Sequence, residues 1–399
     1  MTPLRIALVI PGRFHGFDLA RALLARGHDV TVLTNYPKSV VEGFGVPAAR
    51  VRSFLGHGAF VRGYGQLSRL LPMPSSESWS LEMFGRWAAR ELRGTPWDIV
   101  HCWSGASEEL LEDGRVSAGC RLLMRGSAHI DVQSRLLIDE EARAGVRLDR
   151  PSAWIIDRER REYQLADQIL TLSTWSHHTF IEQGVAAERL SLVPLGVDVR
   201  GFRPSEDDLA ARQRRLMSGA PLRVLYVGHV SMRKGAVDLV AAIRARTARL
   251  HFTLVGEVLA EAKALVSTLP AGVEITGKLP QASLAARYHA ADVFMFPTIE
   301  DGFPQVLAQA KAAGLPIITT AHGAGLDIVT HGRDGWIVPI RDSGALVERL
   351  DWCDAHRPEL AAMTAAIVSS FAPRDWSDVA EDFERESARL LARRGVHHG

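Results

Sequence analysis

The sequence predicts an α/β protein made of two doubly wound domains, each built around a parallel sheet. Apolar strands alternate with helices twice along the 399 residues, and this alternation is typical of βαβ units. The length of 399 residues also suggests two domains. A segment rich in proline and glycine, PLGVDVRGFRP at 194–204, separates the two halves as a linker would. We therefore expect one domain over residues 1–200, a second over 201–370, and a C-terminal helical segment over 371–399.

Composition and charge exclude several classes of protein. The apolar fraction of 47% is ordinary for a globular chain with a full core. The formal net charge of +1 argues against nucleic acid as the main partner. Cys102, Cys120 and Cys353 lie far apart, so we expect reduced thiols, with no disulfide framework and no zinc site. No apolar run approaches transmembrane length and the start lacks the features of a signal peptide, so we expect a cytoplasmic protein.

The first domain opens with a βαβ unit. Its predicted elements are a strand, a helix and a strand: Leu4–Ile10, Phe17–Arg26 and Asp29–Leu33. The loop between the first strand and the helix contains Gly12, His15 and Gly16. This loop lacks the GxGxxG pattern, so it does not favour a nicotinamide cofactor.

His129 is a candidate functional residue of the first domain. A strand predicted at Arg121–Arg125 ends in Gly-Ser-Ala-His at 126–129, and a residue just past a parallel strand lies at the ligand edge of the sheet. A single histidine is as often structural or a helix cap, and both interpretations of His129 stay open. Other elements predicted in this domain are two strands, a helix and a short strand: Asp98–Trp103, Asp167–Leu172, Ile156–Ala166 and Leu190–Val193.

The second domain begins with a glycine-bearing loop that suits a phosphate. A buried strand at Leu222–Val227 is followed by the loop Gly228–Gly235 and a helix at Ala236–Arg246. Backbone N–H groups of such loops cradle phosphates, and Arg233 or Lys234 would neutralise the charge. The alternative is a solvated basic turn.

A second strand–loop–helix unit lies further along this domain. An apolar strand at Val293–Phe296 leads to two acids, Glu300 and Asp301, and a helix is predicted from Pro304 to about Ala313. A buried strand follows at Leu315–Thr319. The helix N-terminus suits a phosphate and the acids suit sugar hydroxyls. The alternative is a plain strand–helix unit with solvated acids.

In this region the sequence resembles the nucleotide-sugar site of retaining GT-B glycosyltransferases of family four. The family pattern is a glutamate before Gly-Phe, a second glutamate eight residues later, a helix of small residues, Gly-x-Pro and a buried strand. Asp301 and Gln309 stand at the two glutamate positions, and Glu300 could replace Asp301 through a one-residue shift. Gln309 can hydrogen-bond a ribose but carries no charge. His229 stands where the family usually has arginine, and Lys234 stands at the family's lysine position.

The resemblance covers almost the whole chain and is strongest from Leu190 to Asp342. It implies a GT-B architecture, in which the predicted helix Asp375–Arg394 crosses back to the first domain. The catalytic candidates are His129, Lys234 and Asp301. The donor-binding candidates are Gly12, His15, Gly16, His229, Arg233, Lys234, Lys278, Leu279, Glu300, Asp301, Gly302, Phe303, Pro304, Gln305, Val306 and Gln309.

The resemblance leads us to expect a retaining, metal-independent glycosyltransferase. It would move a hexose-type sugar from a UDP- or GDP-sugar to a hydroxyl group of a glycan, a glycolipid or a small-molecule glycoside. The nucleotide sugar is a co-substrate, so no bound cofactor is expected, and the sequence has no Asp-x-Asp metal motif.

Several alternatives stay open. A GT-B epimerase or hydrolase would release free sugar without an acceptor, and a non-catalytic protein would bind nucleotide sugars without turnover. Residues 40–93 are either an irregular insertion or a surface that faces the acceptor. Peripheral contact with the inner face of a membrane is a further possibility.

Overall fold

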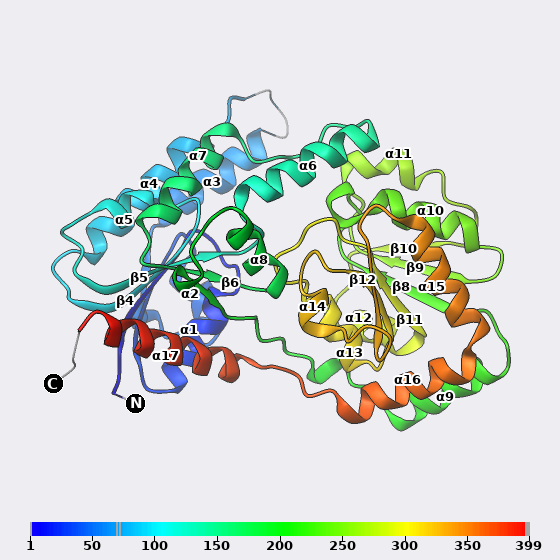
Figure 1. Ribbon diagram of the computed structural model, residues 1–399. Helices are drawn as coiled ribbons and strands as arrows, with labels where there is room; N and C mark the ends of the chain where they lie inside the picture. Colours follow the sequence, from blue (N-terminus) through cyan, green and yellow to red (C-terminus); the bar gives the residue numbers. More distant parts are fainter. Residues whose placement is uncertain (1, 69–70, 72, 396–399) are drawn as a thin grey trace.

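The computed structural model describes residues 2–68, 71 and 73–395, and it shows two α/β domains side by side (Figure 1). The strands, in chain order, are β1 Arg5–Ile10, β2 Asp29–Thr34, β3 Val51–Ser53, β4 Trp97–Trp103, β5 Ala118–Arg125, β6 Gln168–Thr171, β7 Leu190–Leu192, β8 Arg223–Val227, β9 His251–Val255, β10 Glu274–Gly277, β11 Val293–Phe296, β12 Ile317–Thr320 and β13 Gly335–Val338. The first domain has the order β3-β2-β1-β4-β5-β6-β7, and the second has the order β10-β9-β8-β11-β12-β13. Neighbouring strands in both sheets pair in parallel, which confirms the predicted fold class.

Helices join consecutive strands, as parallel pairing requires. The α-helices are α1 Gly16–Ala25, α2 Lys38–Glu42, α3 Leu55–Leu67, α4 Glu77–Leu92, α5 Glu108–Glu112, α6 Ile130–Ala144, α7 Ala153–Leu165, α8 Thr174–Glu182, α9 Glu206–Met217, α10 Ala236–Arg246, α11 Lys263–Val266, α12 Gln281–Ala290, α13 Gln305–Ala312, α14 Gly325–Ile328, α15 Ser343–Ala355, α16 Arg357–Ser370 and α17 Trp376–Arg393. Short 3-10 helices are η1 Ala48–Arg50, η2 Ala187–Arg189, η3 Arg200–Phe202, η4 Met232–Lys234 and η5 Ala260–Ala262.

The strand β1 is buried on both faces of its sheet. Ile6, Leu8 and Ile10 belong to one apolar cluster of the first domain, whereas Ala7 and Val9 belong to another. Successive side chains of a strand point to opposite faces, so the two clusters lie on the two sides of the sheet. A continuous apolar run is the sequence that such a strand needs.

The region 40–93 is more regular than its sequence suggests. It contains the helices α3 and α4, and the sequence predicted neither of them. The helix α3 carries several glycines, which are the residues least favourable to helices after proline. Packing explains one of these glycines, since a Cβ on Gly58 would lie 2.0 Å from the carbonyl oxygen of Asn35. The break predicted from Pro72 falls partly outside the described residues.

The C-terminal helix α17 packs against α1 of the first domain, as Figure 1 shows. The guanidinium of Arg26 and the ring of His28 both bond the carboxylate of Glu384, at 2.7 and 2.8 Å. The helix α16, which precedes the crossing and was not predicted from the sequence, packs instead on the second domain through buried Leu360 and Ile367. No helix in the described part of the chain is long and apolar enough to span a membrane.

Polar contacts join the two domains beside the cleft. The helix α6 reaches the second domain, where Arg143 pairs with Asp238 at 2.6 Å and Glu140 accepts from Arg341 at 2.9 Å. Leu137, also on α6, is buried in the core of the second domain. These contacts hold the carboxyl ends of the two sheets opposite one another.

Candidate active site

Lys234 and Asp301 meet at the edge of the second sheet. Lys234 ends η4, shortly after β8, and Asp301 lies in the loop after the neighbouring strand β11. The ammonium of Lys234 forms an ion pair with the Asp301 carboxylate and also donates to the backbone oxygen of Glu300 at 3.2 Å. Burial lowers the pKa of Lys234, and the carboxylates of Asp301 and Glu300 oppose that shift. The pair places a cation and an anion together at the carboxyl edge of the second sheet.

The glycine loop is shaped to hold Lys234 there. The hydroxyl of Ser231 accepts from the backbone N–H of Lys234 at 3.3 Å and caps η4. Gly235 follows with a φ of +76°, and a Cβ at that position would lie 1.9 Å from the Pro297 oxygen. Only glycine fits both the left-handed backbone and the close approach. The loop is fastened to the β11 side because Ile299 N–H donates to the Arg233 oxygen at 3.0 Å.

Glu300 points into the domain interface. Its carboxylate, which is fully buried, accepts hydrogen bonds from Ser127 Oγ, from Gln133 Nε2 at 3.1 Å and from Arg233 Nε at 2.6 Å. Burial raises the pKa of Glu300, but Arg233, Lys234 and the hydrogen bonds outweigh it and lower the pKa to about 2. Glu300 is therefore a charged contact between the domains.

Gly302 brings the donor-domain loop onto the first domain. A Cβ at Gly302 would lie 1.9 Å from the oxygen of Gly126, so the two backbones touch. Phe303 packs against the apolar cores of both domains. Pro304 is the N-cap of α13, and the helix begins at Gln305, one residue later than predicted, with Val306 half-buried in the same first turn.

Gln309 lies within α13 and has a partner inside its own domain. Its Oε1 accepts from the hydroxyl of Tyr288 on α12 at 3.1 Å. Tyr288 is fully buried, so this bond fixes the side chain of Gln309 against α12. Its predicted contact with a ribose stays a prediction.

His129 is the N-cap of α6. Its Nδ1 accepts from the backbone N–H of Asp131 at 3.3 Å, and its ring packs against those of Tyr163 and Phe180, with centroids 4.9 Å away in each case. Burial lowers its pKa to about 4, and nearby Arg125 adds to the effect. The ring is neutral near pH 7, with its proton on Nε2 because Nδ1 is an acceptor. The helix-cap interpretation describes this contact, and a catalytic role stays a prediction.

The other predicted donor residues are spread along the two facing edges. His15 lies between Trp103 and Trp376, at centroid distances of 5.4 and 6.1 Å, and Gly12 and Gly16 flank it in the loop after β1. The side chain of His229 is exposed after β8. Lys278 and Leu279 follow β10, which β9 and β8 separate from β11. The structure thus brings Lys234, Arg233, Glu300 and Asp301 into contact, but not His129, His15 or Lys278 with them.

Three first-domain residues that support the site were not identified from the sequence. Ser127 and Gln133 bond Glu300, and Arg125 donates to Gln133 Oε1 at 2.7 Å. These residues lie far from Glu300 in the chain. Only the position of 126–129 after a strand hinted that this segment would meet a partner.

Comparison with known proteins agrees with this architecture. Residues 221–353 match the family described as Glycosyl transferases group 1, and residues 14–200 match Glycosyltransferase Family 4. The chain is 31% identical over 294 residues to a GDP-mannose-dependent alpha-mannosyltransferase of Mycobacterium tuberculosis (strain CDC 1551 / Oshkosh), covering 73% of each chain. It is 31% identical over 257 residues, 62% of each chain, to the protein of the same description from Mycolicibacterium smegmatis.

Two solved structures share the fold. Sucrose-phosphate synthase from Thermosynechococcus elongatus superimposes with a TM-score of 0.70 at 21% identity, over 98% of this chain and 100% of that one. Anabaena HepE in complex with UDP and glucose gives 0.63 at 17% identity, over 96% and 99%. The two facing domains are those of the GT-B class. The chain belongs to the group 1, family four glycosyltransferases.

Proposed function

We propose that this glycosyltransferase moves a hexosyl group from a nucleotide diphosphate sugar to an acceptor hydroxyl, with retention of anomeric configuration. The observation that carries the proposal is the ion pair of Lys234 and Asp301 after β8 and β11. It supplies a cation for a diphosphate and a carboxylate for sugar hydroxyls at one point of the cleft. As the bond to the phosphate oxygen breaks, negative charge grows there, and a preplaced ammonium stabilises the transition state more than the ground state.

The neighbouring groups fit the same chemistry. The first turn of α13 offers backbone N–H groups to the diphosphate, so Lys234 and the helix amides meet its charge without a metal ion. Asp301 would bind the transferred sugar and Gln309 the ribose. His129 would lie near the sugar across the cleft, on the segment that touches Gly302.

GDP-mannose is the first donor to test, because the relatives from two mycobacterial species are described as GDP-mannose-dependent. UDP-sugars are the second choice. The acceptor is proposed only as a hydroxyl of a glycan, a glycolipid or a small-molecule glycoside. We further propose that the protein works in the cytoplasm, with peripheral contact at the inner face of the membrane.

A donor screen tests the proposal. The full chain is incubated with GDP- and UDP-sugars, with and without a panel of hydroxyl acceptors and in the presence of a chelator, and released nucleotide diphosphate is measured. We expect acceptor-dependent release, and an NMR spectrum of the product should show the anomeric configuration of the donor. Release of free sugar without an acceptor would indicate a hydrolase or epimerase instead. Nucleotide binding with no release from any donor would indicate a binding protein.

A further inference from the structure

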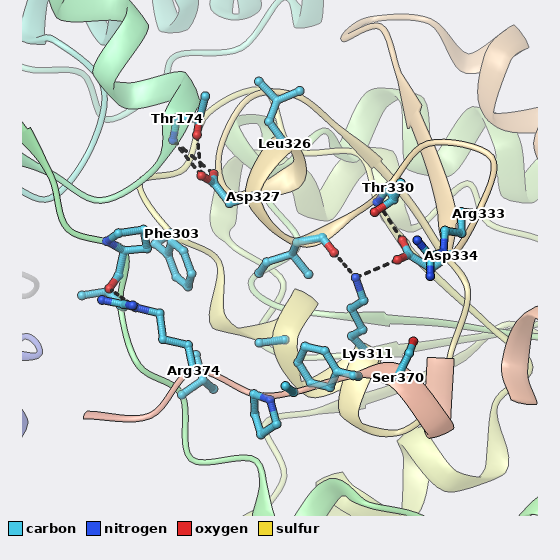
Figure 2. A pocket seen from close by; sticks show the side chains of 18 residues that line it. Thr174, Phe303, Lys311, Leu326, Asp327, Thr330, Arg333, Asp334, Ser370 and Arg374 are labelled. Carbon is cyan, nitrogen blue, oxygen red and sulfur yellow. Dashed lines mark hydrogen bonds and ion pairs between the residues drawn. The ribbon is translucent and has the colours of Figure 1, made fainter. Parts of the chain in front are cut away.

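A cavity of about 620 Å³ lies at the hinge between the domains (Figure 2). Both segments that cross between the domains line it, with Leu195 and Val197 from the first crossing and residues 370–374 from the second. Thr174 contributes from the first domain, and α13 and α14 form the opposite wall. Small-molecule sites have volumes of about 300–1,000 Å³, so the cavity has room for one organic ligand.

This hinge cavity is separate from the Lys234–Asp301 pair. Those two residues follow β8 and β11, whereas the cavity is bordered by α14 and its following turn, which come after β12 on the other side of β11. Neither Lys234 nor Asp301 lines it. From α13 it is lined by Ala308 and Lys311. A ligand in the hinge cavity would leave the proposed diphosphate position open.

Among the described charged side chains around the cavity, the cation Arg333 and the anion Asp327 have no ion pair, and Asp327 is instead hydrogen-bonded by Thr174. Lys311 is neutralised by Asp334, whose carboxylate lies 2.8 Å from the ammonium. The guanidinium of Arg374 pairs with Asp382. Within the described part of the chain, the guanidinium of Arg333 has no hydrogen bond or ion pair; the residue is exposed, and Figure 2 shows it beside Asp334. A negatively charged group would therefore find its partner at Arg333.

The wall combines polar and apolar groups. Leu326 lines the cavity and keeps 43% of its surface exposed, so its side chain is open to a ligand. The larger apolar side chains of the lining are Leu195, Val197, Phe303, Leu326, Ile328 and Phe371. We propose that the hinge cavity binds a small organic anion, with its charged group on Arg333 and its apolar body on these side chains.

Such a ligand would touch the parts that set the angle between the domains. At the cavity wall, Asp327 accepts from the hydroxyl and the backbone N–H of Thr174, at 2.6 and 3.0 Å, and this contact joins the domains. Phe303 is two residues after Asp301 and packs on both cores. A bound anion would therefore contact both crossing segments, and its binding does not depend on the proposed sugar transfer.

The dye anilinonaphthalene sulfonate tests the proposal, because it joins an apolar aromatic body to one sulfonate. We expect saturable binding to the full chain by fluorescence. Arg333→Glu replaces an attraction by a repulsion and should weaken binding about tenfold. Ala372→Trp, at an exposed lining residue, should abolish it by filling the mouth. The matched control is Arg244→Glu, an equal charge change at an exposed position on α10, which should bind as the wild type does.

Hydrogen exchange locates the bound dye. Backbone amides in 195–203 and 370–376 should exchange more slowly with dye present, and an excess of GDP or UDP should not displace it. Equal affinity of the wild type, Arg333→Glu and Ala372→Trp would overturn the proposal, and so would protection confined to other segments. Displacement by nucleotide would also overturn it, since the dye would then occupy the donor site.

Discussion

Gln133 Nε2 donates a hydrogen bond to Glu300 Oε2 at 3.1 Å, and this contact joins α6 of the first domain to the loop after β11. The adjacent carboxylate, that of Asp301, pairs instead with Lys234. Two consecutive acids therefore have different partners. One is buried between the domains, and the other, with 21% of its side chain exposed, lies where a ligand can reach it.

Asp301→Asn should separate sugar transfer from nucleotide binding. The change keeps the size of the side chain but removes the charge that pairs with Lys234 and would bind sugar hydroxyls. We expect turnover to fall by about a hundredfold, the cost of losing one preorganised charged group. The affinity for the bare nucleotide diphosphate should change little. Steady-state kinetics and calorimetric titration of the nucleotide check both values.

Glu300→Gln is the matched control for Asp301→Asn. It removes a buried charge that Arg233 neutralises at the domain interface. Its main effect should therefore be a lower thermal midpoint of unfolding, with a smaller effect on turnover. If turnover collapses in Glu300→Gln and stays normal in Asp301→Asn, the sugar ligand is Glu300.

Lys234→Ala should mainly affect turnover, whereas Arg233→Ala should mainly affect stability. Lys234 is expected to meet the leaving diphosphate, so its loss should lower turnover by about a hundredfold or more. Arg233 is bonded to Glu300 at 2.6 Å, and its loss leaves a buried carboxylate without its main cation. Arg233→Ala should therefore reduce stability more than Lys234→Ala does, and turnover less. Near-normal turnover in Lys234→Ala together with a collapse in Arg233→Ala would reverse the two roles.

The sequence predicted the sheets well because parallel strands buried on both faces have a clear pattern. Ile6, Leu8 and Ile10 on one face and Ala7 and Val9 on the other form one continuous apolar run. Such a run is the pattern of a strand buried on both faces. The helix α3 was missed because its glycines disfavour a helix locally, while a close approach such as Gly58 to Asn35 is visible only in three dimensions.

The site was predictable only where its residues follow neighbouring strands of one sheet. Lys234 and Asp301 could be placed together, since they follow strands at one sheet edge. The separation of Glu300 from Asp301 could not, because it depends on Ser127 and Gln133, which lie in another domain.

His129 can be tested with a substitution that keeps the helix cap. His129→Ala removes the acceptor for the Asp131 N–H, at about 1 kcal/mol, and also the ring that packs against Tyr163 and Phe180. Asparagine is a good N-cap, so His129→Asn should recover the part of the loss that is due to the cap. If the imidazole also acts on the sugar, turnover stays low in both variants. Recovery of turnover along with stability in His129→Asn would make His129 a cap only.

Gln309→Leu should weaken nucleotide binding. Leucine keeps similar bulk but leaves a ribose hydroxyl and the Tyr288 hydroxyl unpaired, at about 1–3 kcal/mol for each buried group. We expect a rise of tenfold or more in the dissociation constant of GDP or UDP, roughly as that energy implies. Gln309→Glu, which retains an acceptor for Tyr288, is the control. Unchanged nucleotide affinity in Gln309→Leu would make Gln309 a packing residue.

Acid should destabilise the protein through His101, which lies on β4 against Trp103 and Phe383. Its ring is fully buried, and neither nitrogen has a hydrogen-bond partner in the part of the chain that the structure describes. Burial, with a smaller effect of His15, lowers its pKa from 6.5 to about 3. Below about pH 6.5 the unfolded chain therefore binds a proton that the folded chain does not, and the free energy of unfolding falls as the pH falls, by up to about 1.4 kcal/mol per pH unit.

His101→Phe keeps an aromatic ring and removes the titration, so the free energy of unfolding should depend less steeply on pH. Urea unfolding at about pH 7, 6 and 5 measures both slopes. Carboxylates that titrate in this range, such as Glu162, whose pKa burial raises to about 8, contribute to both proteins alike, so equal slopes would show that His101 is not the group responsible.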